Sequence, residues 1–144
     1  MKVVSILKAK GSDVATTSPQ TSIATVARLL RDQHIGALVV SEDGAGVLGL
    51  ITERDIVHGL ADRGPALLDM PASFAMTRGP ATCTPDDDIR TVMSRMTRQR
   101  VRHLPVLVDG RLQGIVSIGD VVKHRLDELE LETNVLRDAY IAAR

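Results

Sequence analysis

The sequence is poor in residues that several common functions require. Phe74 and Tyr140 are its only aromatic residues, so it offers almost no surface on which nucleic-acid bases stack. Basic and acidic residues are balanced at 18 each, so no net positive field attracts nucleic acid. A single cysteine, Cys83, excludes an internal disulfide and a cysteine-rich zinc cluster. We therefore expect no nucleic-acid partner.

Long apolar runs and catalytic signatures are missing as well. No apolar run reaches the length of a membrane span, and the opening MKVVSILKAKG lacks the apolar core of a signal peptide. The sequence has no phosphate-binding loop, no dinucleotide-binding glycine fingerprint and no HExxH zinc motif. We expect a cytoplasmic protein that is not an enzyme, holds no metal and contacts no membrane.

An internal repeat dominates what is present. The stretch GLITERDIV at 49–57 returns as GIVSIGDVV at 114–122. Upstream of both, apolar residues recur at the spacing of an amphipathic helix, after a proline and small polar residues. The matching positions are separated by 66 residues: Pro19 and Pro85, Ile23 and Ile89, Val26 and Val92, Ala27 and Met93, Leu30 and Met96.

Each helix is followed by two apolar runs around an Asp-Gly pair, a pattern that predicts a hairpin. The runs are GALVV and VLGLI in the first copy, LPVLV and LQGIV in the second. A further helix follows, at about 53–62 and from 119 onward. A unit of about 60 residues buries a small fraction of its surface, so its stability alone is marginal. We therefore predict an α+β globule in which two βαββα repeats pack sheet-to-sheet around one core, with pseudo-two-fold symmetry.

The predicted boundaries follow from these patterns. The first repeat and the N-terminal segment occupy 1–64, a proline-containing linker with a short helical turn occupies 65–80, and the second repeat occupies 81–125. Because 120–144 lacks glycine and proline, we expect a long helix whose last part, 126–144, extends beyond the repeat. Its residues Val122, Leu126, Leu129, Thr133, Leu136 and Tyr140 form a heptad-like stripe. Self-association is the favoured use of this stripe, and docking back onto the same chain is the alternative.

Three consecutive acidic residues, Asp86, Asp87 and Asp88, allow two interpretations. They have the chemistry of a cation site, but no histidine or cysteine accompanies them. They also stand at the start of a predicted helix, where acidic side chains complement the helix dipole. The second interpretation is favoured.

Together these features resemble a tandem pair of CBS domains, the module named after cystathionine β-synthase. The carriers are the two nine-residue stretches, the preceding IGALVV and VRHLPVLV, and the entries TTSP and TCTP. The resemblance covers about residues 1–125. It implies two clefts that bind adenosine-containing ligands, AMP foremost, with ADP, ATP or NAD as further candidates.

The resemblance also implies roles for individual residues. Thr52 and Asp55 would hold ribose in one cleft, and Ser117 and Asp120 in the other. Phosphate would be bound by Arg54, Arg102 and His103, with Lys8 and Lys10 as weaker candidates. The adenine pocket would be lined by Val14, Ala15, Thr16, Ile35, Ala81, Thr82, Cys83 and Val101.

The two copies differ at the phosphate positions. The first has Gly36 and Ala37 where the second has Arg102 and His103, and the second has Gly119 where the first has Arg54. We expect chemically unequal clefts, with Arg54 beside one aspartate and Arg102 and His103 beside the other.

A purely structural interpretation of the repeated motif remains open. Thr or Ser followed three positions later by Asp is also the pattern of a helix N-cap, which needs no ligand. The hydroxyl residue can serve both roles, whereas the aspartate cannot easily do so.

The predicted function is that of a nucleotide sensor without catalytic activity. A ligand would change the shape of a homodimer, and a downstream protein of unknown identity would respond. The alternatives are a ligand-free structural dimer and a protein-interaction adaptor that works through its C-terminal helix.

Overall fold

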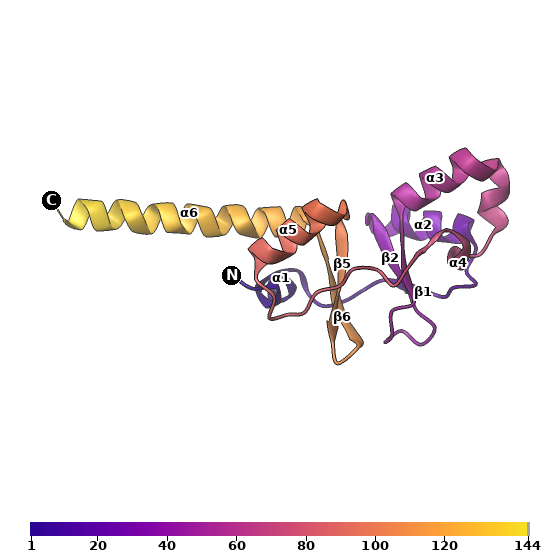
Figure 1. The fold of residues 1–144 in the computed structure, drawn as a ribbon, viewed down its shortest axis with the longest axis horizontal. Coiled ribbons are helices and arrows are strands. Elements are labelled where there is room, and N and C mark those ends of the chain that lie inside the picture. The colour runs from indigo at the N-terminus through magenta and orange to yellow at the C-terminus, as the bar shows by residue number, and fades with distance from the viewer. Residues whose placement is uncertain (144) are drawn as a thin grey trace.

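The two repeats form two neighbouring lobes, and a long helix projects from the second (Figure 1). The computed structural model describes residues 1–143, so Arg144, the end of the predicted helix, lies outside it. The first lobe contains β1 (Thr16–Thr17), α2 (Ile23–Gln33), β2 (Ala37–Val40), β3 (Gly49–Thr52) and α3 (Glu53–Arg63). The second contains α5 (Ile89–Gln99), β5 (His103–Val108), β6 (Arg111–Ser117) and α6 (Ile118–Ala142). The predicted α+β class, with two repeats and a long terminal helix, is confirmed.

The linker between the lobes contributes more structure than the sequence indicates. It forms a 3₁₀ helix (Gly64–Asp69), the predicted short helix α4 (Ala72–Ala75) and the strand β4 (Thr77–Arg78). Strand β4 pairs antiparallel with β3 and completes a sheet of order β1-β2-β3-β4. A strand of two residues has too few positions to show an alternating pattern, so β4 was not predicted.

The two hairpins are closed differently. In the second lobe Asp109 and Gly110 both have positive φ, 51° and 75°, as a two-residue turn between twisted strands requires. In the first lobe β2 ends at residue 40 and β3 begins at residue 49, so a longer loop replaces the predicted short one. There Asp43 Oδ1 accepts hydrogen bonds from Ala45 N at 2.9 Å and Gly46 N at 2.8 Å. These bonds satisfy loop amides that a tight hairpin would have paired between its strands.

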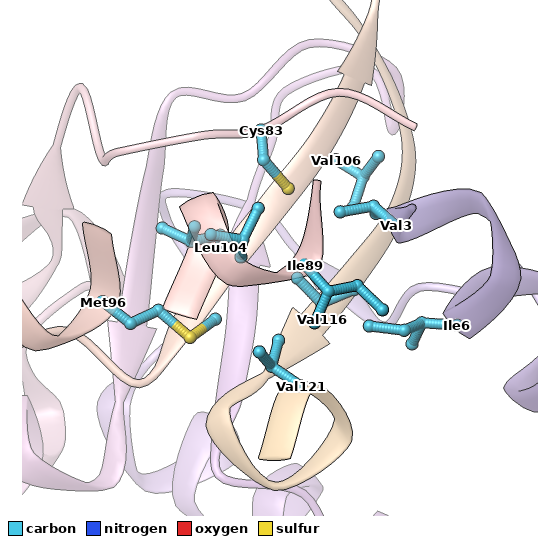
Figure 2. Close-up of a cluster of buried hydrophobic side chains, with 10 residues drawn as sticks. Val3, Ile6, Cys83, Ile89, Met96, Leu104, Val106, Val116 and Val121 are labelled. Atoms are coloured by element: carbon cyan, nitrogen blue, oxygen red, sulfur yellow. The ribbon is translucent and has the colours of Figure 1, made fainter. Parts of the chain in front are cut away.

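The N-terminal helix packs on the second lobe rather than the first. The sequence grouped this segment with the first repeat, but Val3 and Ile6 of α1 (Val3–Lys10) are fully buried in the other lobe. Figure 2 shows both side chains among second-lobe residues, including Ile89 and Val106. The short helix therefore provides apolar surface that the second repeat needs to close its own core.

The linker does the same for the first lobe. Ala72 of α4 and Met76 belong to the buried cluster of that lobe. The isolated bridges Lys2–Asp88 and Ser22–Pro71 occupy corresponding places in the two lobes. Each lobe is thus completed by the segment that precedes the other repeat.

The repeats do pack sheet-to-sheet, but they do not share a single core. Each lobe has its own buried cluster, and a third, smaller cluster lies between the sheets. Ala37, Val39 and Leu50 meet Leu112 and Ile115 there. Successive side chains of a strand point to opposite faces, so one face packs on the lobe's own helices and the other on the facing sheet.

No helix within residues 1–143 is both long and apolar enough to span a bilayer.

Candidate functional site

The first repeated motif is a strand-to-helix junction that caps α3. Thr52 Oγ1 accepts a hydrogen bond from Asp55 N at 3.2 Å. In return, Asp55 Oδ2 accepts from Thr52 N at 2.9 Å and from Thr52 Oγ1 at 3.0 Å. This reciprocal capping box satisfies amide donors that a helix start otherwise leaves unpaired.

The second motif caps α6 in the same way. Ser117 Oγ accepts from Asp120 N at 3.1 Å, and Asp120 Oδ2 accepts from Ser117 N at 2.9 Å. The capping interpretation is therefore confirmed for both motifs. Capping occupies only Oδ2 of Asp55, and Oδ1 takes part in no hydrogen bond within residues 1–143. For Asp55, a capping role and a ligand-binding role are compatible.

A cleft of about 290 Å³ lies beside the first junction, at the lower end of the size range of small-ligand sites. The first lobe contributes Thr52, Arg54 and Asp55 to its lining. The second contributes Arg102 and His103. Its apolar walls are formed by Leu50, Pro80, Ala81 and Val101. Residues of both lobes therefore face one space.

Other predicted site residues do not line this cleft. They are Ser117, Asp120, Val14, Ala15, Thr16, Ile35, Thr82 and Cys83. Cys83 instead packs in the core of the second lobe, where 2% of it is exposed. Burial, together with the charge of Asp87, raises the pKa of the Cys83 thiol to about 12, so it is an inert core residue.

Arg102 and His103 are placed differently from the prediction. The sequence associated them with Asp120 of their own repeat, and their backbone does belong there, because Ile118 N donates to Arg102 O at 2.8 Å. Both residues nevertheless line the cleft beside Asp55. The packing of the lobes brings the start of β5 to the first junction, so the cationic residues gather in one cleft.

Three arginines contribute to the lining of this cleft. Arg54, Arg100 and Arg102 line both the cleft and an adjoining hollow of about 320 Å³. Within residues 1–143, none of the three guanidinium groups takes part in a hydrogen bond or ion pair. The acidic residues of the cleft are Glu53 and Asp55. Unpaired guanidinium groups of this kind bind phosphate oxygens well.

Arg100 was missed by the sequence argument. It ends α5 in the left-handed region, with φ of 53°, and His34 ends α2 with the same φ. A non-glycine residue in this conformation is uncommon and often lies near functional sites. The separation of 66 positions marks Arg100 as the repeat counterpart of His34, but it does not indicate that Arg100 faces a cleft.

The second junction is already occupied by a side chain of the same protein. Lys10 Nζ donates to Asp120 Oδ2 at 2.7 Å and to Ile115 O at 3.1 Å. Burial alone would raise the pKa of Asp120, but the hydrogen bonds from Lys10 and Ser117 outweigh it and hold the pKa below the ordinary value. The carboxylate of Asp120 therefore has an ammonium partner, and Asp55 has none among the residues that the structure describes.

His103 lies between the two junctions. Its ring packs on Gly36, where a Cβ would stand 3.3 Å from ring atoms Cε1 and Nε2. Burial, followed by the charge of Lys10, lowers the pKa of His103, while Glu53 and Asp120 act in the opposite direction. The imidazole is therefore neutral at neutral pH and senses the charges of both junctions.

A larger hollow, about 750 Å³, runs along α5 but contains none of the predicted site residues. Its lining comes from the exposed side of this helix and from Asp88, so it lacks the opposing walls of a binding site. Asp88 is the N-cap of α5, with Oδ1 accepting from Arg90 N at 2.8 Å, and Asp87 Oδ2 accepts from Thr84 N at 2.9 Å. The helix-start interpretation of the acidic run is confirmed. No metal-binding group of three or more His, Cys, Asp or Glu residues occurs within 1–143.

A family model for the CBS domain matches residues 10–62 and 72–127. The chain belongs to the CBS domain family. CBS-domain proteins are generally regulatory or sensor modules, and this chain contains the tandem pair that the sequence resembles.

Solved structures of other CBS proteins share its fold. CBS-domain containing protein ATU1752 from Agrobacterium tumefaciens is 44% identical with a TM-score of 0.83, and the match covers 86% of this chain and 92% of that one. PAE2072 from Pyrobaculum aerophilum, complexed with AMP, is 26% identical with a TM-score of 0.79, covering 92% and 99%. The domain pair of MJ0100, in complex with 5′-methylthioadenosine and S-adenosyl-L-methionine, is 25% identical with a TM-score of 0.78, covering 89% and 98%. The chain covers 74% and 66% of the length of two curated relatives.

Proposed function

We propose that this CBS pair binds one adenine nucleotide per chain, in the Asp55 cleft, and reports it through the shape of a homodimer. One observation carries the proposal: Asp55 Oδ1 and three arginine guanidinium groups, all without a hydrogen-bond or ion-pair partner within residues 1–143, line the same cleft. The binding of AMP by one structural neighbour, and of other adenosine compounds by a second, supports this ligand class.

Each part of a nucleotide has a counterpart in the cleft. Asp55 Oδ1 accepts hydrogen bonds from the ribose hydroxyls, which are charge-assisted and therefore strong. The adenine ring occupies the space between Ala81 and Val101. The phosphate lies between Arg54 and Arg102, near the start of α3, where the positive end of the helix dipole favours an anion.

The arginine cluster favours phosphorylated ligands over cationic ones. AMP is the smallest ligand that uses ribose, base and phosphate contacts together. ADP, ATP or NAD would place further phosphate oxygens toward Arg100 and the adjoining hollow. S-adenosyl-L-methionine brings a sulfonium charge, which three nearby guanidinium groups repel.

The mechanism that we propose is linkage. The ligand contacts residues of both lobes, so it binds most tightly when the lobes close on it and shifts the equilibrium toward that arrangement. In a homodimer the shift would pass to the second copy and then to a downstream protein in the cytoplasm. An adaptor function is the second candidate, because α6 exposes apolar side chains that a partner protein could cover.

Calorimetric titration tests the proposal. AMP, ADP, ATP, NAD and S-adenosyl-L-methionine are titrated into the wild type and into Asp55→Ala, Asp55→Asn and Asp120→Ala. We expect one nucleotide per chain, with affinity reduced by about 10- to 100-fold in both Asp55 variants, because a charged hydrogen-bond acceptor is lost. Asp120→Ala is the matched control and leaves binding unchanged.

Two results would contradict the proposal. The absence of heat and thermal stabilisation with every compound would favour a ligand-free structural dimer. Equal weakening by the Asp55 and Asp120 variants would show that the two clefts are equivalent. Asp55→Asn keeps an oxygen for the helix cap, so it separates loss of binding from loss of capping.

A further inference from the structure

The long helix α6 projects away from both lobes (Figure 1), and it carries an exposed apolar stripe. Val122, Leu126, Leu129, Leu136 and Tyr140, together with Thr133, recur at intervals of four and three residues, and the five apolar members have exposed fractions between 40 and 72%. At these intervals the side chains lie on one side of a helix. Because α6 projects from the body, this stripe stays exposed among residues 1–143, which excludes the back-docked alternative for the part of the chain that the structure describes.

One polar residue interrupts the stripe without breaking it. Thr133 stands between Leu129 and Leu136, and its hydroxyl donates to Leu129 O at 2.9 Å. The hydroxyl is therefore satisfied inside the helix, and the side chain can present its methyl group to a neighbour.

We propose that the α6 stripe pairs with the same stripe of a second copy as a short two-stranded coiled coil, with the two helices parallel and in register. This inference rests on the proposed homodimer and defines its interface. Its basis is the charge pattern beside the stripe, since charges at these flanking positions select the partner and the orientation of a coiled coil.

In a parallel, in-register pair, the residue just before Leu126, Thr133 or Tyr140 faces the residue five positions later in the partner subunit. Glu132 then faces Arg137 of the partner subunit, and symmetry makes this attractive pair twice. Arg125 likewise faces Glu130 of the partner subunit. Since Arg125 already bonds to Glu128 within its own helix, the pair of Glu132 and Arg137 carries more of the selection.

An antiparallel pair that overlaps the whole stripe brings like charges together. Glu130 then faces Glu130 of the partner subunit, and Glu132 faces Glu132 of the partner subunit. Lys123 faces Arg137 of the partner subunit. Each of these contacts is repulsive. The same sequence therefore favours the parallel arrangement and disfavours the antiparallel one, as expected for a helix that pairs with itself.

Cysteine cross-linking tests the orientation. In a parallel, in-register pair, Leu136→Cys places two thiols face to face, so mild oxidation should give a covalent dimer from this single variant. Leu131→Cys is the matched control, because Leu131 has a similar exposed fraction, 62% against 72%, on the opposite side of the helix. The native Cys83 does not interfere, since it is buried and its pKa is about 12.

The cross-linking result has clear consequences. Rapid dimer formation by Leu136→Cys alone supports the proposal. An absence of cross-linking by Leu136→Cys, or equal cross-linking by both variants, overturns it.

Charge reversal tests the pairing of Glu132 with Arg137. Sedimentation velocity at low ionic strength should show Glu132→Arg and Arg137→Glu each weakening the dimer about tenfold, because two attractive pairs become repulsive. The double variant Glu132→Arg, Arg137→Glu should recover wild-type affinity, and 1 M salt should reduce the differences. A chain that is monomeric at every concentration overturns the proposal and assigns the stripe to a partner of different sequence. These measurements are made without nucleotide, so their failure is distinct from a failure of ligand binding.

Discussion

At the scale of single residues, the glycines that open the two repeated motifs are explained by α1 and the linker, the segments that complete the two lobes. A Cβ on Gly49 would stand 2.6 Å from Met76 Sδ and 2.8 Å from Thr77 O. A Cβ on Gly114 would stand 2.6 Å from Leu7 Cδ2, and the other close atoms also belong to the Leu7 side chain. Glycine therefore occurs in both copies because a segment from outside the repeat, 76–77 in the first lobe and α1 in the second, lies against the strand there.

The two glycines should differ in how much a substitution costs. Gly49→Ala meets a backbone carbonyl that cannot move away, so we expect a loss of about 1–3 kcal/mol in the free energy of unfolding. Gly114→Ala meets only the end of a flexible side chain, and the loss should be smaller. Urea denaturation of the two variants measures both values. Equal losses would show that Leu7 is held as rigidly as the backbone at Thr77.

Residue-level prediction from the sequence was reliable where the interaction is local. The capping boxes join residues three positions apart, so their pattern is visible in the sequence. The sequence also identified Thr52, Arg54 and Asp55 as neighbours. It missed Arg100, because no local pattern announces which exposed arginine will face a cleft formed by the other lobe.

At the scale of elements, the short helices α1 and α4 complete lobes to which they do not belong in sequence. Val3 and Ile6 of α1 are buried with the second lobe, and Ala72 and Met76 with the first. Without α1 the second lobe would expose part of its apolar core, and without α4 the first lobe would do the same. The lobes are therefore interdependent even though each has its own core.

Shortening a buried side chain of α1 should destabilise the second lobe selectively. Ile6→Ala removes a fully buried side chain and should cost about 2–5 kcal/mol. Hydrogen exchange should show the loss of protection first in α5, β5 and β6. Val57→Ala in α3 is the control, because Val57 is 62% exposed and its loss should cost less than about 0.5 kcal/mol. Loss of protection confined to α2 and β2 would contradict the packing of α1 on the second lobe.

At the scale of the whole molecule, the inequality of the two junctions depends on one long-range contact. Lys10 and Asp120 are 110 positions apart and meet at 2.7 Å. Asp55, the counterpart of Asp120, has no such cation within residues 1–143. We infer that the ion pair keeps the second junction from binding a ribose.

Removing the cation should make the second junction available. In Lys10→Met, calorimetry at millimolar AMP should detect a second, weaker binding event, which the further substitution Asp120→Ala should abolish. The stability cost should be small, about 0.2–1 kcal/mol, because the pair is partly exposed. Lys8→Met, in the same helix, is the matched control and should retain one site. If Lys10→Met also retains one site, the ion pair is not what excludes a second nucleotide.

Sequence patterns alone predicted the repeat, the amphipathic helices, the tight second hairpin, both helix caps and the long final helix. All of these depend on interactions within a few residues, which leave a period or a spacing in the sequence. Only the tertiary structure placed Arg102 and His103 beside Asp55, Lys10 on Asp120, and α1 on the second lobe. These contacts join residues far apart in the chain. They depend on how two similar surfaces pack against each other, and no local periodicity encodes that packing.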